Sequence, residues 1–260
     1  MKAVVLAAGS KKHYGSRNRL TYPCFVDKPK CLYSIDGKVQ LDEVLENIQE
    51  AGIEKTRVVV GYKADAIRDH LATTKFHVEI VYNKDYEKSA IYSIQVGLKD
   101  IYEDALLLFA DERIPVAQLR AAVATEGGVV VFQRSGKMFP SMNFFKIRQE
   151  NIPLFLDTRF KDLQFVNEID ASLRQAKFYP IPSVSSGYFM EFIFLYIMLK
   201  LDKQKSGQLV RLPGDGYEDV RDLDSFLQTD EYKNSFLRYF TPYYYMPGFL
   251  KKKYQWDNEL

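Results

Sequence analysis

The feature that most constrains the fold of this chain is a series of wholly apolar segments alternating with amphipathic ones through its first half. Apolar runs of strand length lie at 2–6, 56–60, 77–82, 105–110 and 129–132. Between them, apolar residues recur at the spacing of one helix face, as in the 41–52 segment. Strands that are apolar along their whole length and alternate with helices are typical of parallel sheets covered on both faces. The pattern predicts an α/β fold with a mostly parallel sheet flanked by helices.

The second half is less regular and predicts a smaller region beside that sheet. Strands are expected at 142–148 and 178–182, with a polar helix at 160–175 and an apolar helix at 189–201. A chain of 260 residues is compatible with one large domain or two small ones. Because no linker, repeat or low-complexity tract interrupts it, we expect a single domain over 1–260.

Charge and cysteine content exclude several classes of protein. The 36 basic and 34 acidic side chains give a net charge of +2, too little for a general nucleic-acid binder. Cys24 and Cys31 lack C-x-x-C spacing and three histidines are scattered, so neither a disulfide scaffold nor a structural zinc site is expected. No apolar run approaches the ~20 residues of a membrane span. The apolar start is better interpreted as a buried first strand than as a signal peptide, so we expect a cytoplasmic protein.

Two strands end sharply, at Ala8-Gly9 and at Asp111. Ligands of parallel sheets bind beyond the carboxyl ends of the strands, so chemistry is expected there. Small residues at the first turn let a nucleotide approach the backbone closely. The basic loop that follows, together with Lys30, offers the countercharge that a triphosphate needs.

Three short motifs in order carry a family resemblance. They are Leu6-Ala7-Ala8-Gly9, Gly15-Ser16-Arg17 and Pro29-Lys30-Cys31-Leu32. This arrangement resembles the L-A-A-G-x-G-x-R and P-K-x-L pattern of the nucleotidyltransferases that make nucleoside-diphosphate sugars and CDP-alcohols. The resemblance extends over about the first 115 residues, through Gly61-Tyr62 and the strand before Asp111. It implies a Rossmann-like (GT-A-like) fold with a nucleotide-binding half at 1–125 and an acceptor half at 126–260.

The resemblance also implies roles for individual residues. Lys30 would hold the α-phosphate and Arg17 the outgoing pyrophosphate, and both are expected to be catalytic. The loop between Gly9 and Gly15 is longer than in the family, so Lys11 and Lys12 are rivals of Arg17. The expected nucleotide-binding residues are Leu6, Ala7, Ala8, Gly9, Gly15, Ser16, Gly61, Tyr62 and Ser93.

A second resemblance favours CTP as the nucleotide substrate. Residues 83–93 resemble the N-x-x-Y-x-x-x-N-x-x-S stretch of cytidylyltransferases that act on phosphocholine or aminoethylphosphonate. Asn83 and Tyr86 would contact the acceptor and Ser93 would lie near the base. Ala90 replaces the second asparagine, which would leave one contact missing.

The resemblance implies a Mg²⁺ site built from two aspartates. Asp111 stands where the family places its first metal-binding aspartate, and carboxylate oxygen suits this hard cation. The second aspartate comes late in the family. Asp219 matches by position, whereas Asp170 in Glu168-Ile169-Asp170 matches the letters better and is its rival.

The acceptor stays open at this stage. Ser186-Gly187 resembles the short strand that lines the acceptor side in the family. Phosphocholine, aminoethylphosphonate, phosphoglutamine and a sugar 1-phosphate are all candidates, with products expected to decorate cell-surface polysaccharide or lipid. The partners are therefore CTP or another NTP and a small phosphorylated acceptor. The alternatives are a sugar-1-phosphate nucleotidylyltransferase making an NDP-sugar, a GT-A glycosyltransferase and a non-catalytic nucleotide-binding protein. The glycosyltransferase would use D-x-D where this chain has Asp111-Glu112-Arg113.

The C-terminal segment, 236–256, combines many aromatic residues with the Lys251–Lys253 run. Three interpretations stay open for it: contact with an anionic membrane surface, contact in a homodimer, or packing on the core with a solvated lysine run.

Overall fold

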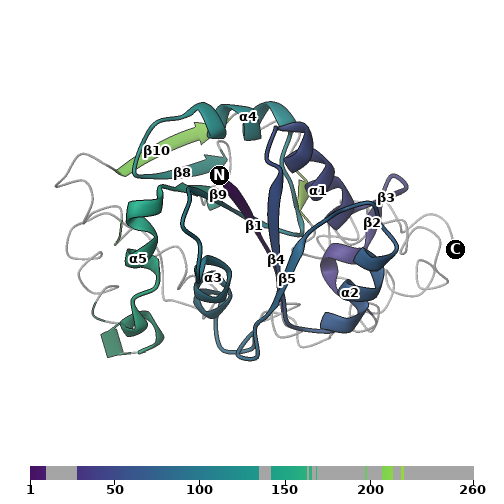
Figure 1. Ribbon diagram of the computed structural model, residues 1–260, viewed down its shortest axis with the longest axis horizontal. Coiled ribbons are helices and arrows are strands. Elements are labelled where there is room, and N and C mark those ends of the chain that lie inside the picture. Colours follow the sequence, from purple (N-terminus) through teal and green to yellow (C-terminus); the bar gives the residue numbers. More distant parts are fainter. Residues whose placement is uncertain are drawn as a thin grey trace, which may run out of the picture.

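Strands and helices alternate through the first half of the chain, as the apolar pattern predicts (Figure 1). The computed structural model describes residues 1–9, 28–134, 142–162, 164–165, 168, 197, 207–212 and 218–219. The strands are β1 (Lys2–Ala7), β2 (Ser34–Ile35), β3 (Lys38–Val39), β4 (Lys55–Val60), β5 (Glu79–Tyr82), β6 (Ala105–Phe109), β7 (Glu112–Arg113), β8 (Val129–Arg134), β9 (Met142–Ile147), β10 (Gly207–Leu212) and β11 (Glu218–Asp219). The α-helices are α1 (Gln40–Glu50), α2 (Ala64–Ala72), α3 (Ala90–Leu98), α4 (Val116–Ala124) and α5 (Ile152–Phe155), and the 3-10 turns are η3 (Lys30–Leu32), η4 (Gln149–Asn151) and η5 (Thr158–Lys161).

One seven-stranded sheet organises the described residues, in the order β10-β8-β9-β6-β1-β4-β5. Strand β1 lies at its centre and pairs in parallel with β4 and β6. Strands β4 and β5 pair in parallel, as do β8 and β10, whereas β9 runs antiparallel to both β6 and β8. The prediction of a mostly parallel mixed sheet is confirmed.

Helices cover both faces of this sheet. Figure 1 shows α3 and α5 on one side of β1 and α1 and α2 on the other. The apolar stripe of α1, with Leu41, Leu45 and Ile48 wholly buried, packs on the first face together with α2 and α4. Helix α3 packs on the second face with α5. Each such aliphatic side chain stabilises the fold by about 1.5–3 kcal/mol through removal from water.

Two buried cations on strands fasten the carboxyl ends of helices. The guanidinium of Arg57 in β4 donates to the carbonyls of Gly97 and Lys99 at the end of α3. The ammonium of Lys146 in β9 donates to the carbonyls of Val123 and Thr125 at the end of α4, at 2.7 and 2.6 Å. Burial lowers the pKa of Lys146. These contacts satisfy carbonyls that a helix end leaves without intrahelical partners.

Some elements differ from the sequence-based expectation or lie beyond the described residues. A small hairpin, β2–β3, turns through Asp36 and Gly37, whose φ values of 52° and 79° suit a Gly-containing two-residue turn. The helix expected at 160–175 is described in part: η5 covers 158–161, and residues 164, 165 and 168 are helical. The strand expected at 178–182 is outside the described residues, as is the helix expected at 189–201 apart from residue 197, which is helical. No helix in the described part of the chain is long and apolar enough to cross a membrane.

Candidate functional site

The carboxyl ends of the three central strands meet at one edge of the sheet. The amide of Tyr62, after β4, donates to the carbonyl of Ala8, after β1, at 3.4 Å. The amide of Ala110, after β6, donates to the carbonyl of Leu6 at 3.1 Å. Gly9 is exposed, and a methyl group placed on it would meet no atom within 4 Å. The predicted nucleotide-binding turns of β1 and β4 therefore adjoin one another, with open space beside the glycine.

Gly61 is required here by a close approach. A Cβ on Gly61 would lie 2.5 Å from the Cβ of Tyr86 and 2.9 Å from the carbonyl oxygen of Ala8. The absent side chain lets Tyr86 pack directly on the backbone that joins β4 to Tyr62. Desolvation and, after it, the charge of Glu87 raise the pKa of the Tyr86 phenol.

Asn83 and Ser93 form a buried hydrogen-bonded pair. The Asn83 amide nitrogen donates to the Ser93 hydroxyl at 2.9 Å, and the Asn83 amide oxygen accepts from the backbone N–H of Asp85 at 2.9 Å. Asn83 is 1% exposed. Since both polar atoms of this amide bond within the protein, the geometry favours a role in holding the turn between β5 and α3. That Asn83 contacts the phosphorylated acceptor and that Ser93 lies near the nucleotide base remain predictions.

The Lys30 turn lies beside the end of β6. Its neighbour Cys31 is buried, and burial, followed by the charge of Asp111, raises the pKa of the Cys31 thiol. Cys31 belongs to the same buried core cluster as Leu108 and Ala110 at the end of β6, so η3 and the β6 end share this part of the core. Lys30 is half-buried, and its carbonyl accepts from the amide of Tyr33 at 3.0 Å. The fold thus brings the P-K-x-L motif to the same edge as the first glycine turn.

Of the two aspartates expected to bind metal, Asp111 lies in a turn and Asp219 on a strand. Asp111 occupies the two-residue turn between β6 and β7, and β7 pairs antiparallel with β11 so that Asp219 stands opposite Glu112. The carboxylate of Asp111 is half-buried and makes no hydrogen bond or ion pair with another described residue. Two aspartates offer hard oxygen donors, which fit Mg²⁺ when triphosphate oxygens and water complete the octahedron. Within the described ranges, no group of three or more His, Cys, Asp or Glu side chains gathers around one point.

Several predicted site residues lie outside the described residues. They are Gly15, Ser16 and Arg17 with the rivals Lys11 and Lys12, the acceptor-side Ser186 and Gly187, and Asp170 as the rival of Asp219. The aromatic and lysine-rich tail lies outside them as well.

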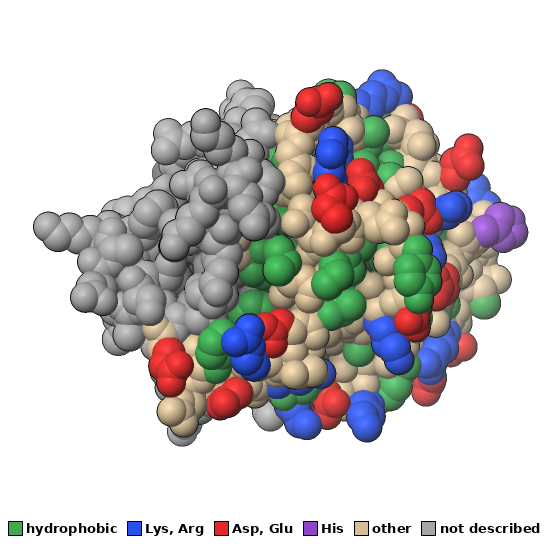
Figure 2. Space-filling view, turned by 60° about the vertical axis from the view of Figure 1, so that its left-hand side comes forward, with side chains coloured by type: hydrophobic (Ala, Val, Ile, Leu, Met, Phe, Trp, Pro, Cys, Tyr) green, Lys and Arg blue, Asp and Glu red, His purple; other side chains and the backbone are tan. Residues whose placement is uncertain are grey.

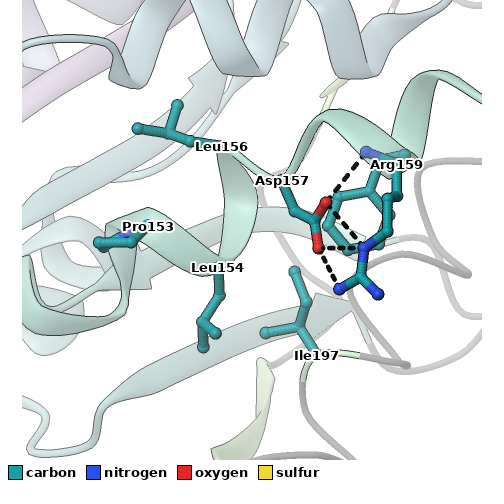
Figure 3. A pocket seen from close by; sticks show the side chains of 7 residues that line it. Pro153, Leu154, Leu156, Asp157, Arg159 and Ile197 are labelled. Carbon is teal, nitrogen blue, oxygen red and sulfur yellow. Dashed lines mark hydrogen bonds and ion pairs between the residues drawn. The ribbon is translucent and has the colours of Figure 1, made fainter.

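A pocket of about 330 Å³ lies elsewhere, beside α5 and η5 (Figure 3). Its wall is mainly apolar, and its charged members, Asp157 and Arg159, are bound to each other. The lining residues are Pro153, Leu154, Leu156, Asp157, Arg159, Phe160 and Ile197. None of them belongs to the strand-end edge, so this pocket is separate from the candidate site.

One contact near the site escaped the sequence analysis. Arg113 in β7 is paired with Glu43 in α1, seventy positions earlier in the chain. Two acidic residues, Asp42 and Glu43, stand in the first turn of α1, where they are expected on helix-dipole grounds alone. No local pattern distinguishes the one that reaches across to β7.

The mixed sheet, with its glycine turn, lysine turn and aspartate at one edge, defines an α/β protein of the nucleotidyltransferase class. Residues 3–179 match the MobA-like NTP transferase domain, and the chain belongs to this family.

Curated relatives agree on the class and differ in the nucleotide. The chain is 37% identical over 112 residues to the UTP–glucose-1-phosphate uridylyltransferase AglF of Haloferax volcanii, covering 43% of each chain. It is 30% identical over 119 residues to the CTP:phosphoglutamine cytidylyltransferase of Campylobacter jejuni, covering 43% of this chain and 44% of the relative. The matches thus span less than half the length of these relatives.

A solved structure supports the fold. The CTP:phosphocholine cytidylyltransferase of Streptococcus pneumoniae superposes with a TM-score of 0.53 at 15% identity, covering 86% of this chain and 95% of that one. At this identity the similarity establishes the architecture alone.

Proposed function

We propose that this protein transfers a nucleotidyl group from a nucleoside triphosphate to a small phosphorylated or phosphonate acceptor, with release of pyrophosphate. The observation that carries the proposal is the strand-end edge. There the turn at Gly9, the close-packed Gly61, the Lys30 turn and Asp111 adjoin one another. A nucleotide laid along this edge would meet backbone amides, a cation and a carboxylate in one place.

CTP is the nucleotide we favour. Its support is the resemblance of 83–93 to the cytidylyltransferase stretch, together with the relative that is named for CTP and phosphoglutamine. The acceptor class is one with an anionic phosphate or phosphonate, of the phosphocholine, aminoethylphosphonate or phosphoglutamine type. Tyr86, Ser186 and Gly187 are the residues we assign to it. We place the reaction in the cytoplasm, where nucleoside triphosphates are available, and its product in cell-surface polysaccharide or lipid synthesis.

The chemistry is an in-line displacement at phosphorus. An acceptor oxygen forms a bond to the α-phosphorus while the bond from that phosphorus to the bridging oxygen of pyrophosphate breaks. The acceptor needs no general base, because a phosphate monoester has its second pKa near ~6 and is already ionised. Catalysis then consists of positioning and charge neutralisation. Lys30 would neutralise the α-phosphate, and Arg17, with Lys11 and Lys12 as rivals, the departing pyrophosphate.

Asp111 and Asp219 are the residues we assign to a divalent cation, which members of this family typically use. When bound, Mg²⁺ would reduce the negative charge of the triphosphate. The chain's own contribution is to place Asp111 in the turn before β7 and Asp219 on the strand that pairs with β7. The Asp111 carboxylate makes no hydrogen bond or ion pair with another described residue.

A second candidate is a sugar-1-phosphate uridylyltransferase. The 37% identical relative acts on UTP and glucose 1-phosphate, as its name states. In this alternative the strand-end edge, the displacement at the α-phosphorus and the divalent cation are the same. The nucleotide base and the acceptor differ.

The test measures pyrophosphate release with Mg²⁺, each ribonucleoside triphosphate and dTTP, and a panel of the acceptors named above. Release with CTP and one amine-bearing acceptor supports the favoured branch, whereas release only with UTP or dTTP and a sugar 1-phosphate supports the second candidate. Asp111→Asn is expected to lower the rate by about 10²–10³, as removal of such a charge contact does. The exposed Asp69→Asn in α2 is the matched control. Turnover near the wild-type rate in Asp111→Asn would contradict the assignment.

A further inference from the structure

Among the described residues, the short strand β7 links the two aspartates, because it follows Asp111 and pairs with the strand that carries Asp219. It follows the Asp111 turn directly and consists of two residues. Its antiparallel partner β11 also has two residues, with Glu218 opposite Arg113 and Asp219 opposite Glu112. An isolated pair of this length is not stable by itself in water. Something other than the pairing must hold β7 in place.

Helix α1 supplies that support. The Arg113 side chain forms an ion pair with Glu43: Nη2 donates to Oε1 at 2.8 Å, and Nε lies 2.5 Å from Oε2. The two side chains are only 19% and 15% exposed. One turn further along, the Asn47 amide donates to the carbonyl of Ile114 at 3.0 Å. This ion pair holds Arg113 of β7, and the Asn47 hydrogen bond holds Ile114, the residue that follows β7, so α1 contacts this segment at two neighbouring residues.

The helix that carries these groups is itself rigid. Three apolar side chains of α1, Leu41, Leu45 and Ile48, are at most 2% exposed in the core beneath the sheet. Contacts with α1 therefore connect β7 to the core, in addition to the turn at Asp111.

We propose that the Glu43–Arg113 pair is a positioning device for β7, and through it for Asp111, which precedes β7, and Asp219, which lies on its partner strand. This inference rests on the proposed function, because it concerns the cation that the transfer reaction would use. Loss of the pair would weaken the attachment of β7 to α1, and with it the register that sets Asp219 opposite Glu112.

The test is the Mg²⁺ requirement of Glu43→Gln. The half-saturating Mg²⁺ concentration for pyrophosphate release is expected to rise about tenfold or more, as when groups that orient metal ligands are removed. The KM for the nucleoside triphosphate at saturating Mg²⁺ is expected to stay near the wild-type value. Glu50→Gln is the matched control, since Glu50 also pairs from α1 to an arginine, Arg120, but at the surface. An unchanged Mg²⁺ requirement in folded Glu43→Gln overturns the proposal.

Two further variants separate position from charge. Glu43→Gln combined with Arg113→Met removes the Arg113 charge along with the pair, so a positioning role predicts that the Mg²⁺ requirement stays raised. Arg113→Lys keeps the charge and one contact and is expected to fall between the wild type and Glu43→Gln. A double variant with the wild-type requirement would reduce the effect to charge and overturn the positioning role.

A measurement without turnover keeps this inference separable from the proposed function. Backbone hydrogen exchange of the 218–219 segment in metal-free protein is expected to be faster in Glu43→Gln than in Glu50→Gln. If the wild type releases no pyrophosphate with any triphosphate, the proposed function fails, and this exchange comparison still decides the positioning role. Equal exchange in the two variants overturns it.

Discussion

At the scale of single residues, the shape of the candidate site depends on atoms that are absent as much as on those present. Because Gly61 has no side chain, Tyr86 and the carbonyl of Ala8 occupy the space that a methyl group on residue 61 would need. Gly97 does the same for α3, since a Cβ there would lie 2.6 Å from Cγ1 of Val4 and 2.9 Å from Cγ2 of Val59. The first glycine sets the strand-end edge, and the second sets how closely α3 covers the sheet.

Gly61→Ala is therefore expected to destabilise the protein by about 1–3 kcal/mol, the usual cost of overpacking. The added methyl group meets a backbone oxygen as well as a side chain, so a rotamer change of Tyr86 cannot relieve the clash alone. Urea unfolding followed by circular dichroism measures the change. Gly9→Ala, which adds its methyl group in open space, is the control and is expected to leave the free energy of unfolding nearly unchanged. Equal stability of the two variants would show that the edge is not closely packed.

At the scale of elements, an ion-pair network at the opposite end of the sheet fastens the edge strand β5. Glu79 in β5 accepts from Lys2 in β1 at 2.8 Å and from Arg57 in β4 at 2.8 Å. Arg57 also caps α3, so three strands and a helix end share one cluster. The hydrogen bond from Arg57, with the Lys2 contact after it, lowers the pKa of Glu79 against a smaller opposing effect of burial.

This shift predicts a pH dependence with a defined sign. Because the folded-state pKa of Glu79 lies below its ordinary value of about 4.5, its contribution to stability is present above that value. The contribution is lost as the pH falls through the lower, folded-state pKa. Glu79→Gln is expected to be less stable than the wild type at pH 7 and to lose less stability as the pH falls below about 4.5. Urea titrations across that range measure both effects, with exposed Glu54→Gln as control; parallel curves for wild type and Glu79→Gln would contradict the assignment.

The sequence predicts elements whose signal is local and misses those that depend on distant partners. The stripe of α1 and the apolar run of β6 are contained in a few consecutive residues, and both are confirmed. Strand β11 is two polar residues long, and only β7, about a hundred residues earlier, makes it a strand. Arg57 breaks the apolar pattern of β4, and its capping of α3 depends on a helix end forty positions away.

The same distinction applies to the candidate site. The glycine turn and Asp111 could be named in advance because each directly follows a recognisable strand, and the lysine turn because it resembles a family motif; the structure brings them to one edge. The family resemblance pointed to Asn83 as an acceptor contact, whereas its burial and two internal hydrogen bonds favour a positioning role. Such a distinction requires knowing which polar groups surround a side chain, and a linear motif does not contain that information.

At the scale of the whole molecule, the candidate site is coupled to the centre of the sheet. The strand ends that form it belong to β1, β4 and β6, which are consecutive in the sheet and carry core residues on both faces. Strand β10, from late in the chain, extends the same sheet beyond β8. Figure 2 shows acidic and basic side chains interspersed over the described surface of the face it presents, so on that face neither sign forms a continuous patch. A single domain stays our prediction, and a ligand at this edge would then stabilise the sheet as a unit.

Nucleotide binding is accordingly expected to raise the thermal stability of the full chain. A ligand at a hundred times its Kd stabilises the native state by about 2.7 kcal/mol. For a domain of this size, that corresponds to a rise in Tm of about 5–10 °C. Thermal unfolding with Mg²⁺ and each triphosphate at equal concentration would rank the nucleotides, and CTP is expected to give the largest shift. Asp111→Asn is expected to lose the Mg²⁺-dependent part of it. A larger shift with UTP than with CTP would instead favour the uridylyltransferase candidate, and no shift with any triphosphate at millimolar concentration would contradict nucleotide binding at this edge.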